Sequence, residues 1–312
     1  MTGNTFSRRW VLGSLLAGAA SLPAWAEAPS RSPRPRARPG AAGAPRSAAR
    51  ASAPAAEALV DAARLSGRTT YVVADAETGS PLEALGADTL QPPASVAKIM
   101  TTLYALDRLG GGHRFATRVL ATGPVANGTV QGDLILAGTG DPTLTSDALG
   151  DLALALRRAG VKSVSGRFLV WAEALPAISR IAPDQPVHAG YNPAISGLNL
   201  NYNRVHFEWK RNGKGYNLSM DARADRFVPA VSMVTMKVVA RDLPVYTYAA
   251  GPGREDWTVA STALGKGGSR WLPVRYPELY TAEVFATLAR AQGVSLPAAE
   301  ATRQLPQASV LA

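Results

Sequence analysis

The 312-residue sequence predicts a mixed fold of the α/β (α+β) type, and three observations support this. Apolar residues recur at helical spacing after residue 97 and again after residue 146, and each run ends at glycine. Residues 199–260 mostly show strand patterns and carry a hairpin turn at Asn212-Gly213. A hydrophobic fraction of 46% supports real cores, either in one large domain or in two ordinary ones.

The first 26 residues have the pattern of an export signal. Arg8-Arg9 precedes an apolar stretch over residues 11–22, and Ala24-Trp25-Ala26 supplies a small-x-small cleavage site. The apolar stretch is short for a membrane anchor, which is the alternative interpretation. We therefore expect a twin-arginine signal peptide and a bacterial periplasmic protein. Residues 27–56 are rich in Ala, Pro and Arg and predict a disordered linker, which acts either as a plain spacer or as a weak basic tether to the anionic envelope surface.

Charge and composition exclude several classes of function. The formal charge is +10, but eight arginines and one acid in residues 1–50 account for +7 of it, so the remainder gives little support to nucleic-acid binding. The chain has no cysteine, which excludes thiol catalysis, disulfides and thiolate metal sites. Three scattered histidines, His113, His188 and His206, share no metal-ligand spacing, and we expect His206, within a strand, to be a surface or packing residue rather than a catalyst. We expect no cofactor and no metal.

Ser95-Val96-Ala97-Lys98 is the most informative motif. It follows two prolines and opens an apolar run with Ile99, Leu103 and Leu106 at helical spacing, which predicts the start of a buried helix. Residues three apart share a helix face, so the Lys98 amine can reach the Ser95 hydroxyl and activate it as a nucleophile. The ordinary alternative is a core helix with a capping serine and a lysine that extends to solvent.

Other elements follow from the same patterns. Residues 59–65 predict a short helix, and residues 69–74 and 82–85 predict a strand pair. The glycine-rich loop at 138–144 lacks the Gly-Lys-Ser/Thr of a phosphate-binding loop. Ser146 is expected to cap the next helix. Further expected elements are strands at 115–122, 129–137, 165–171, 205–209, 216–220, 234–239 and 245–249, and a helix at 281–292.

Several blocks together resemble the D-alanyl-D-alanine carboxypeptidase/endopeptidase family, the class C low-molecular-mass penicillin-binding proteins. These blocks are residues 93–98, 132–134 with 138–144, 159–166, 191–196 with 203–205, and 271–275 with 280–293. In this combination and order they are far more specific than Ser-x-x-Lys alone, and the resemblance covers roughly residues 57–310.

The resemblance implies a β-lactamase/transpeptidase-like domain interrupted by a mostly β insertion. Its first part would be residues 57–112, the insertion 113–279, and the start of the resumed domain 280–312. The resemblance also implies that Ser95 is acylated by peptidoglycan stem peptides or by β-lactam antibiotics, with its own backbone N–H in the oxyanion hole. Lys98 would be the general base.

The sequence departs from the family pattern in one respect. It contains neither the later Ser-x-Asn nor the Lys-Thr-Gly motif, and Lys266-Gly267-Gly268 falls in a block that the family places before its second motif. We therefore expect the printed chain to be the amino-terminal part of a longer protein, poorly active and prone to aggregate by itself. A serine β-lactamase and a non-catalytic peptidoglycan-binding envelope protein are the alternative functions.

Overall fold

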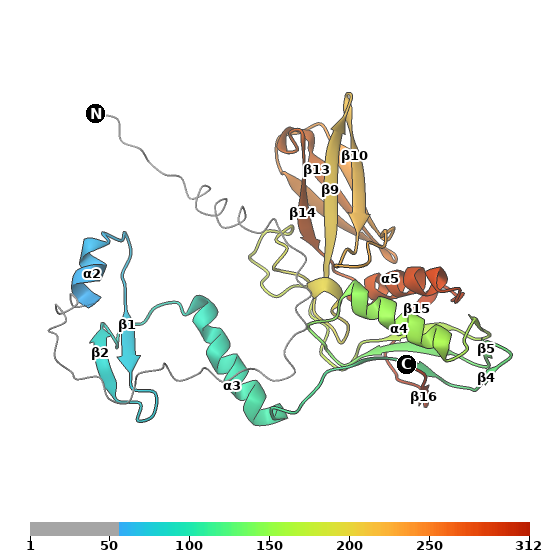
Figure 1. Cartoon of the computed structure of the whole chain (residues 1–312). Helices are drawn as coiled ribbons and strands as arrows, with labels where there is room; N and C mark the ends of the chain where they lie inside the picture. The colour runs from blue at the N-terminus through green and yellow to red at the C-terminus, as the bar shows by residue number, and fades with distance from the viewer. Residues whose placement is uncertain (1–55) are drawn as a thin grey trace, which may run out of the picture. The chain divides into compact units, whose positions relative to one another are not determined.

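A computed structural model describes residues 56–312 of the chain (Figure 1). The expected signal peptide and all but the last residue of the expected linker lie outside these residues. The chain divides into two compact units, one ending at Ser95 and one running from Val96 to Ala312. The two units are described separately.

The first unit contains a short helix and a hairpin, as expected. Helix α2 spans Ala56–Ala62, and strands β1 (Tyr71–Ala74) and β2 (Pro81–Leu85) pair antiparallel. Asp75 begins the turn between the strands, because its Oδ1 accepts the backbone N–H groups of Glu77 and Thr78. These hydrogen bonds favour the carboxylate and lower the pKa of Asp75.

The helix after the Ser-x-x-Lys motif exists, but its expected burial is wrong. The 3₁₀ turn η1 (Ala94–Val96) leads into α3 (Ala97–Leu109), and Gly110 ends the helix with φ 78°. None of its residues is buried; Met100, for example, is 69% exposed. Within the second unit, no other helix or strand packs extensively on α3, and its large apolar side chains are exposed.

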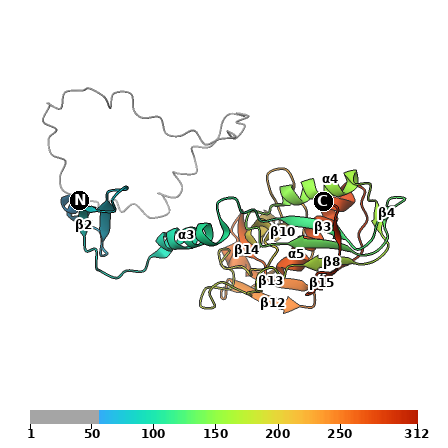
Figure 2. The ribbon, with the colours of Figure 1, turned by 90° about the horizontal axis from the view of Figure 1, so that it is seen from below.

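A five-stranded sheet forms the centre of the second unit, with strand order β15-β8-β6-β3-β16 (Figure 2). The β3/β6 and β3/β16 pairs are antiparallel, whereas β6/β8 and β8/β15 are parallel. The strands are β3 (Thr117–Ala121), β6 (Leu134–Gly138), β8 (Phe168–Trp171), β15 (Ala299–Thr302) and β16 (Ser309–Val310). The single strand expected over residues 129–137 is wrong: the chain is broken there into β5 and β6, and β5 (Thr129–Val130) joins β4 (Val125–Ala126) and β7 (Ser163–Val164) in a small separate sheet.

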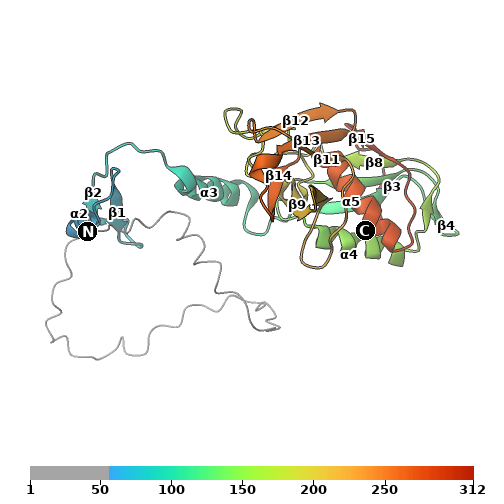
Figure 3. The ribbon, with the colours of Figure 1, turned by 90° about the horizontal axis from the view of Figure 1, so that it is seen from above.

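Two helices pack against each other and cover one face of the central sheet (Figures 1 and 3). They are α4 (Ser146–Arg158) and α5 (Pro277–Ala291). The expected cap of α4 is one residue too late: Thr145 has the extended backbone of an N-cap, and its Oγ1 accepts the N–H of Ala148. No helix of the described residues is both long and apolar enough to cross a membrane.

Two further three-stranded sheets confirm the expected β-rich region. One has the order β10-β9-β14, and its β9/β10 hairpin extends away from α4 and α5 (Figure 1). The other has the order β11-β13-β12 and contributes the buried Trp257 to the same apolar core as Phe207 of β9. The strands are β9 (Arg204–Asn212), β10 (Gly215–Asp221), β11 (Val234–Val239), β12 (Tyr246–Gly251), β13 (Arg254–Ala260) and β14 (Gly267–Pro273). Two 3₁₀ turns, η2 (Leu200–Tyr202) and η3 (Ser261–Ala263), adjoin these strands.

The packing of the second unit is continuous across residue 280. Helix α5 packs on α4 and β8, β15 pairs with β8, and β16 pairs with β3. Elements from the carboxyl end of the chain therefore belong to the same compact unit as residues 117–171. The domain limits expected from the sequence, 57–112, 113–279 and 280–312, remain a prediction.

A buried carboxylate ties β13 to the beginning of α5. Glu255 has no solvent-exposed surface, and its Oε1 accepts the backbone N–H groups of Arg275 at 2.7 Å and Tyr276 at 2.9 Å. These N–H groups precede the first turn of α5, so Glu255 caps the entry to the helix from a distant strand. Burial outweighs the two hydrogen bonds and raises the pKa of Glu255 to about 7.

Replacing Glu255 with glutamine tests this raised pKa. The folded chain holds a proton on Glu255 up to about pH 7, whereas an unfolded glutamate releases it near its ordinary pKa of 4.5. Binding of this proton therefore contributes its full stabilising free energy below the pKa of the unfolded chain. The contribution is lost as the pH rises through the pKa of the folded chain. Between about pH 5 and about pH 8, the free energy of unfolding should fall less in Glu255→Gln than in the parent chain.

Denaturant unfolding followed by tryptophan fluorescence at several pH values measures this difference. Glu300→Gln, at an exposed position of β15, is the matched control and should follow the parent. Parallel curves for the parent and Glu255→Gln would contradict the assignment.

A close backbone contact at the end of β6 supplies a second test. A Cβ atom at Gly138 would lie well inside van der Waals contact with the carbonyl oxygen of Gly197 and the side chain of Leu198. Gly138→Ala should therefore destabilise the chain by about 1–3 kcal/mol. Gly111→Ala, whose Cβ would meet nothing within 4 Å, should cost much less. Thermal unfolding compares the two, and equal midpoints would show that the contact relaxes freely.

Candidate functional site

The two residues of the predicted catalytic pair lie at the start of α3. Ser95 is the middle residue of the 3₁₀ turn η1 and ends the first unit, and Lys98 is in the first turn of α3 in the second unit. Both residues are exposed. The N-cap position of α3 is Val96 rather than Ser95, so the alternative of a capping serine on a buried helix does not describe this segment.

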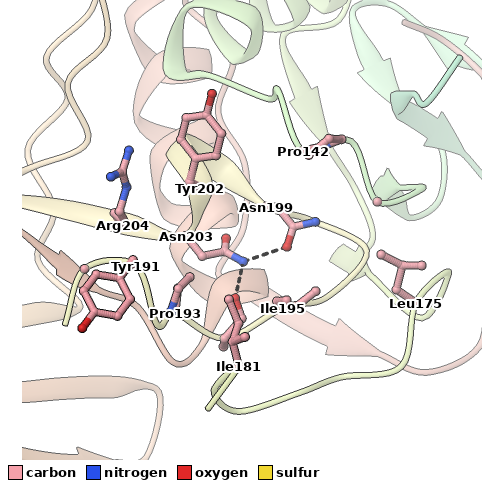
Figure 4. A pocket seen from close by; sticks show the side chains of 13 residues that line it. Pro142, Leu175, Ile181, Tyr191, Pro193, Ile195, Asn199, Tyr202, Asn203 and Arg204 are labelled. Carbon is pink, nitrogen blue, oxygen red and sulfur yellow. Dashed lines mark hydrogen bonds between the residues drawn. The ribbon is translucent and has the colours of Figure 1, made fainter. Parts of the chain in front are cut away.

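A separate pocket of about 590 Å³ opens in the second unit (Figure 4). Its walls are largely apolar, and a few polar side chains lie on one side, which is the usual character of a small-ligand site. Neither Ser95 nor Lys98 lines it. The lining residues are Gly140, Pro142, Leu175, Ile181, Gly190, Tyr191, Pro193, Ala194, Ile195, Asn199, Tyr202, Asn203 and Arg204.

Three successive residues beside this pocket adopt the left-handed backbone conformation. Asn201, Tyr202 and Asn203 have φ values of 50°, 60° and 50°. Asparagine tolerates this region, but a tyrosine there costs free energy that the surrounding structure must offset. The strained segment covers the end of η2 and the residue before β9, and Tyr202 and Asn203 from it line the pocket next to Arg204, the first residue of β9.

Asn203 fixes the polar side of the pocket. Its Nδ2 donates to the Ala194 carbonyl and to Asn199 Oδ1, both at 2.8 Å (Figure 4). Its Oδ1 is buried and has no hydrogen-bond partner among the described residues. An unpaired buried acceptor is costly, so the rest of the structure must offset this free energy.

Arg204 is held between two aromatic rings. Its guanidinium carbon lies 5.0 Å from the ring centre of Tyr202 and 5.2 Å from that of Trp271. Such stacking orients an arginine while leaving N–H donors at its edge. Arg204 therefore places one oriented cation at the edge of a mainly apolar pocket.

The described histidines offer no alternative catalytic base in this pocket. His206 is buried in β9 and packs edge-on against Trp271, as expected for a packing residue. Burial, assisted by the nearby Arg223, lowers the pKa of His206. Burial likewise lowers the pKa of His188, which stacks on Tyr246. Within residues 56–312, no group of three or more His, Asp or Glu side chains is placed to hold a metal ion.

Residue patterns alone did not predict the pocket. Residues 191–196 and 203–205 stood out only as blocks of the family resemblance. The local signal that was available is the run from Asn199 to Asn203, because closely spaced asparagines favour left-handed turns. The approach of distant loops that completes the pocket has no local signature.

Curated relatives match parts of the chain. A D-alanyl-D-alanine carboxypeptidase from Actinomadura sp. (strain R39) is 33% identical over 149 residues, which cover 46% of this chain and 27% of the relative. The D-alanyl-D-alanine carboxypeptidase DacB of Haemophilus influenzae is 37% identical over 73 residues, which cover 23% of this chain and 15% of the relative.

The fold also matches solved structures. Penicillin binding protein 4 (dacB) of Haemophilus influenzae aligns with a TM-score of 0.59 and 22% identity over 75% of this chain and 53% of that protein. A structure of the same protein complexed with a novel β-lactam aligns with a TM-score of 0.57 and 20% identity, covering 78% and 54% of the two chains. The chain thus spans about half the length of these relatives, and the α+β fold class predicted from the sequence is confirmed. Because the D-Ala-D-Ala carboxypeptidase 3 (S13) family matches residues 51–312, the chain belongs to that family.

Proposed function

We propose that the chain carries the nucleophilic part of a serine-type D-Ala-D-Ala carboxypeptidase/endopeptidase that acts on peptidoglycan stem peptides. One observation supports this most strongly: the family match over residues 51–312 includes Ser95-x-x-Lys98, placed where η1 leads into α3. A helix amino terminus suits a serine nucleophile, because its N–H groups and dipole favour the negative charge that develops on the attacked carbonyl.

In this mechanism Ser95 Oγ attacks the carbonyl of the D-Ala-D-Ala peptide bond, and Lys98 Nζ accepts the hydroxyl proton. The backbone N–H of Ser95 is one donor to the oxyanion. The nitrogen of the leaving D-alanine takes from Lys98 the proton that came from Ser95, as the C–N bond breaks and the acyl-enzyme forms. Lys98 then accepts a proton from water as the water oxygen attacks the ester, and it returns that proton to Ser95 Oγ as the shortened peptide leaves.

The proposed cellular location, substrates and inhibitors follow from the same assignment. The protein would be exported to the periplasm by the twin-arginine route, with residues 1–26 as the signal and residues 27–56 as a linker that contacts the anionic envelope surface at most weakly. Peptidoglycan stem peptides are the proposed substrates, and β-lactams, which mimic the scissile bond, the proposed inhibitors. The proposed acyl transfer uses a serine nucleophile and a lysine base, so no cofactor enters the mechanism, and nucleic acid has no part in it.

Covalent labelling by a fluorescent penicillin tests the assignment of Ser95. We expect slow acylation of residues 27–312, because the sequence contains the nucleophile and its base but neither Ser-x-Asn nor Lys-Thr-Gly. Ser95→Ala should abolish the adduct. Lys98→Ala should slow its formation by about 10²-fold or more, the usual range for loss of a general base.

Thr101→Val is the matched control: Thr101 lies in α3 and donates its hydroxyl to the Ala97 carbonyl, so its loss should leave labelling unchanged. Peptide mass mapping must place the adduct on Ser95. An adduct on another residue, or none on the parent chain after long incubation, would refute the proposal.

A further inference from the structure

One long irregular loop forms much of the wall of the pocket. Residues 172–199, between β8 and η2, contain neither a helix nor a strand. This loop supplies Leu175, Ile181, Tyr191 and Ile195 to the pocket (Figure 4). Long loops without secondary structure are uncommon in compact domains and usually functional, so whatever fixes this loop also fixes the shape of the pocket.

The side chain of Arg275 holds this loop at three separate points. Its Nη1 donates to the carbonyl oxygens of Ser179 at 3.1 Å and Asn192 at 2.5 Å, and its Nη2 donates to the carbonyl of Val187 at 2.9 Å. A guanidinium offers five N–H donors in one rigid plane, so one residue can bind three backbone oxygens that are distant in sequence.

The chain leading to Arg275 supports the same loop. The N–H of Ala194 donates to the Val274 carbonyl at 3.0 Å. A Cβ at Gly190 would come within 2.7 Å of the Trp271 carbonyl, so the loop backbone lies directly against β14 there. The loop therefore contacts the end of β14 through both main chain and side chain.

Arg275 is itself fixed in place. Its backbone N–H is bound by the buried Glu255, and its guanidinium is half-buried. Arg275 does not line the pocket. Its influence on the pocket would pass through the loop.

We propose that Arg275 is a positioning residue that holds residues 178–195 in the conformation that forms the pocket wall. Loss of the guanidinium would free three carbonyls of the loop and let Ile181 and Tyr191 move away from the pocket. This inference concerns the pocket and does not depend on the acylation of Ser95, so either proposal can fail without the other.

A spin label on the loop provides the test. The chain has no cysteine, so Tyr191→Cys creates a unique thiol for a nitroxide methanethiosulfonate at a side chain that is 70% exposed. A second labelled chain, Lys210→Cys, reports on β9 away from the loop. In an Arg275→Met background, we expect the spectrum at position 191 to lose its immobilised component, while the spectrum at position 210 does not change.

Two further backgrounds separate positioning from general stability. Arg275→Lys keeps the charge but lacks the planar donors, so it should restore only part of the immobilised signal at position 191. Arg211→Met is the matched control, because Arg211 also donates to a carbonyl, that of Gly265, outside the loop; it should leave position 191 unchanged.

An immobilised label at position 191 in Arg275→Met would overturn the proposal. Equal loss of immobilisation at positions 191 and 210 would overturn it as well, since Arg275 would then stabilise the whole unit rather than the loop. Full recovery in Arg275→Lys would show that the charge, and not the three-point geometry, is what matters.

Discussion

The junction between β14 and α5 depends on the burial of one carboxylate. Glu255 reaches this junction from β13 and accepts the two N–H groups that the chain exposes as it turns from strand into helix. Without an acceptor, these donors would be buried and unsatisfied, which is among the more costly defects in a protein interior. Glu255 therefore positions two elements at once. One is α5, which covers the central sheet and packs in the main core, and the other is Arg275, which binds the loop of residues 172–199.

The pocket combines features that a fold maximising stability alone would avoid. At its edge, Tyr202 has a left-handed backbone conformation, and the buried amide oxygen of Asn203 has no hydrogen-bond partner among residues 56–312. Strain and unsatisfied polar groups persist where the surrounding structure fixes them, and they tend to gather at sites of function. Arg204, confined between Tyr202 and Trp271, adds an oriented cation at the same edge. The pocket is therefore organised before any ligand arrives.

Local patterns predicted much of the fold, and the failures have identifiable causes. The hairpin of residues 71–85, helices α3 and α4 and the β-rich region follow from periodicity and turn residues. Helix α5 was expected to start four residues late. It begins at Pro277, and the acceptor for the Tyr276 N–H just before it is Glu255, which is far away in the sequence. Burial of α3 was inferred from its apolar spacing, but spacing does not reveal which element covers a face. The catalytic assignment of Ser95 and Lys98 rests on their motif and stays a prediction, whereas the pocket arises from contacts between distant loops.

The way in which Arg275 holds the loop has a consequence for how this site can diversify. All three bonds go to backbone carbonyls, at Ser179, Val187 and Asn192, and every amino acid supplies such an oxygen. Side chains along the loop can therefore be exchanged without removing the acceptors that hold it. Substitutions in this loop can therefore change the chemistry of the pocket wall while the backbone that forms it stays in place.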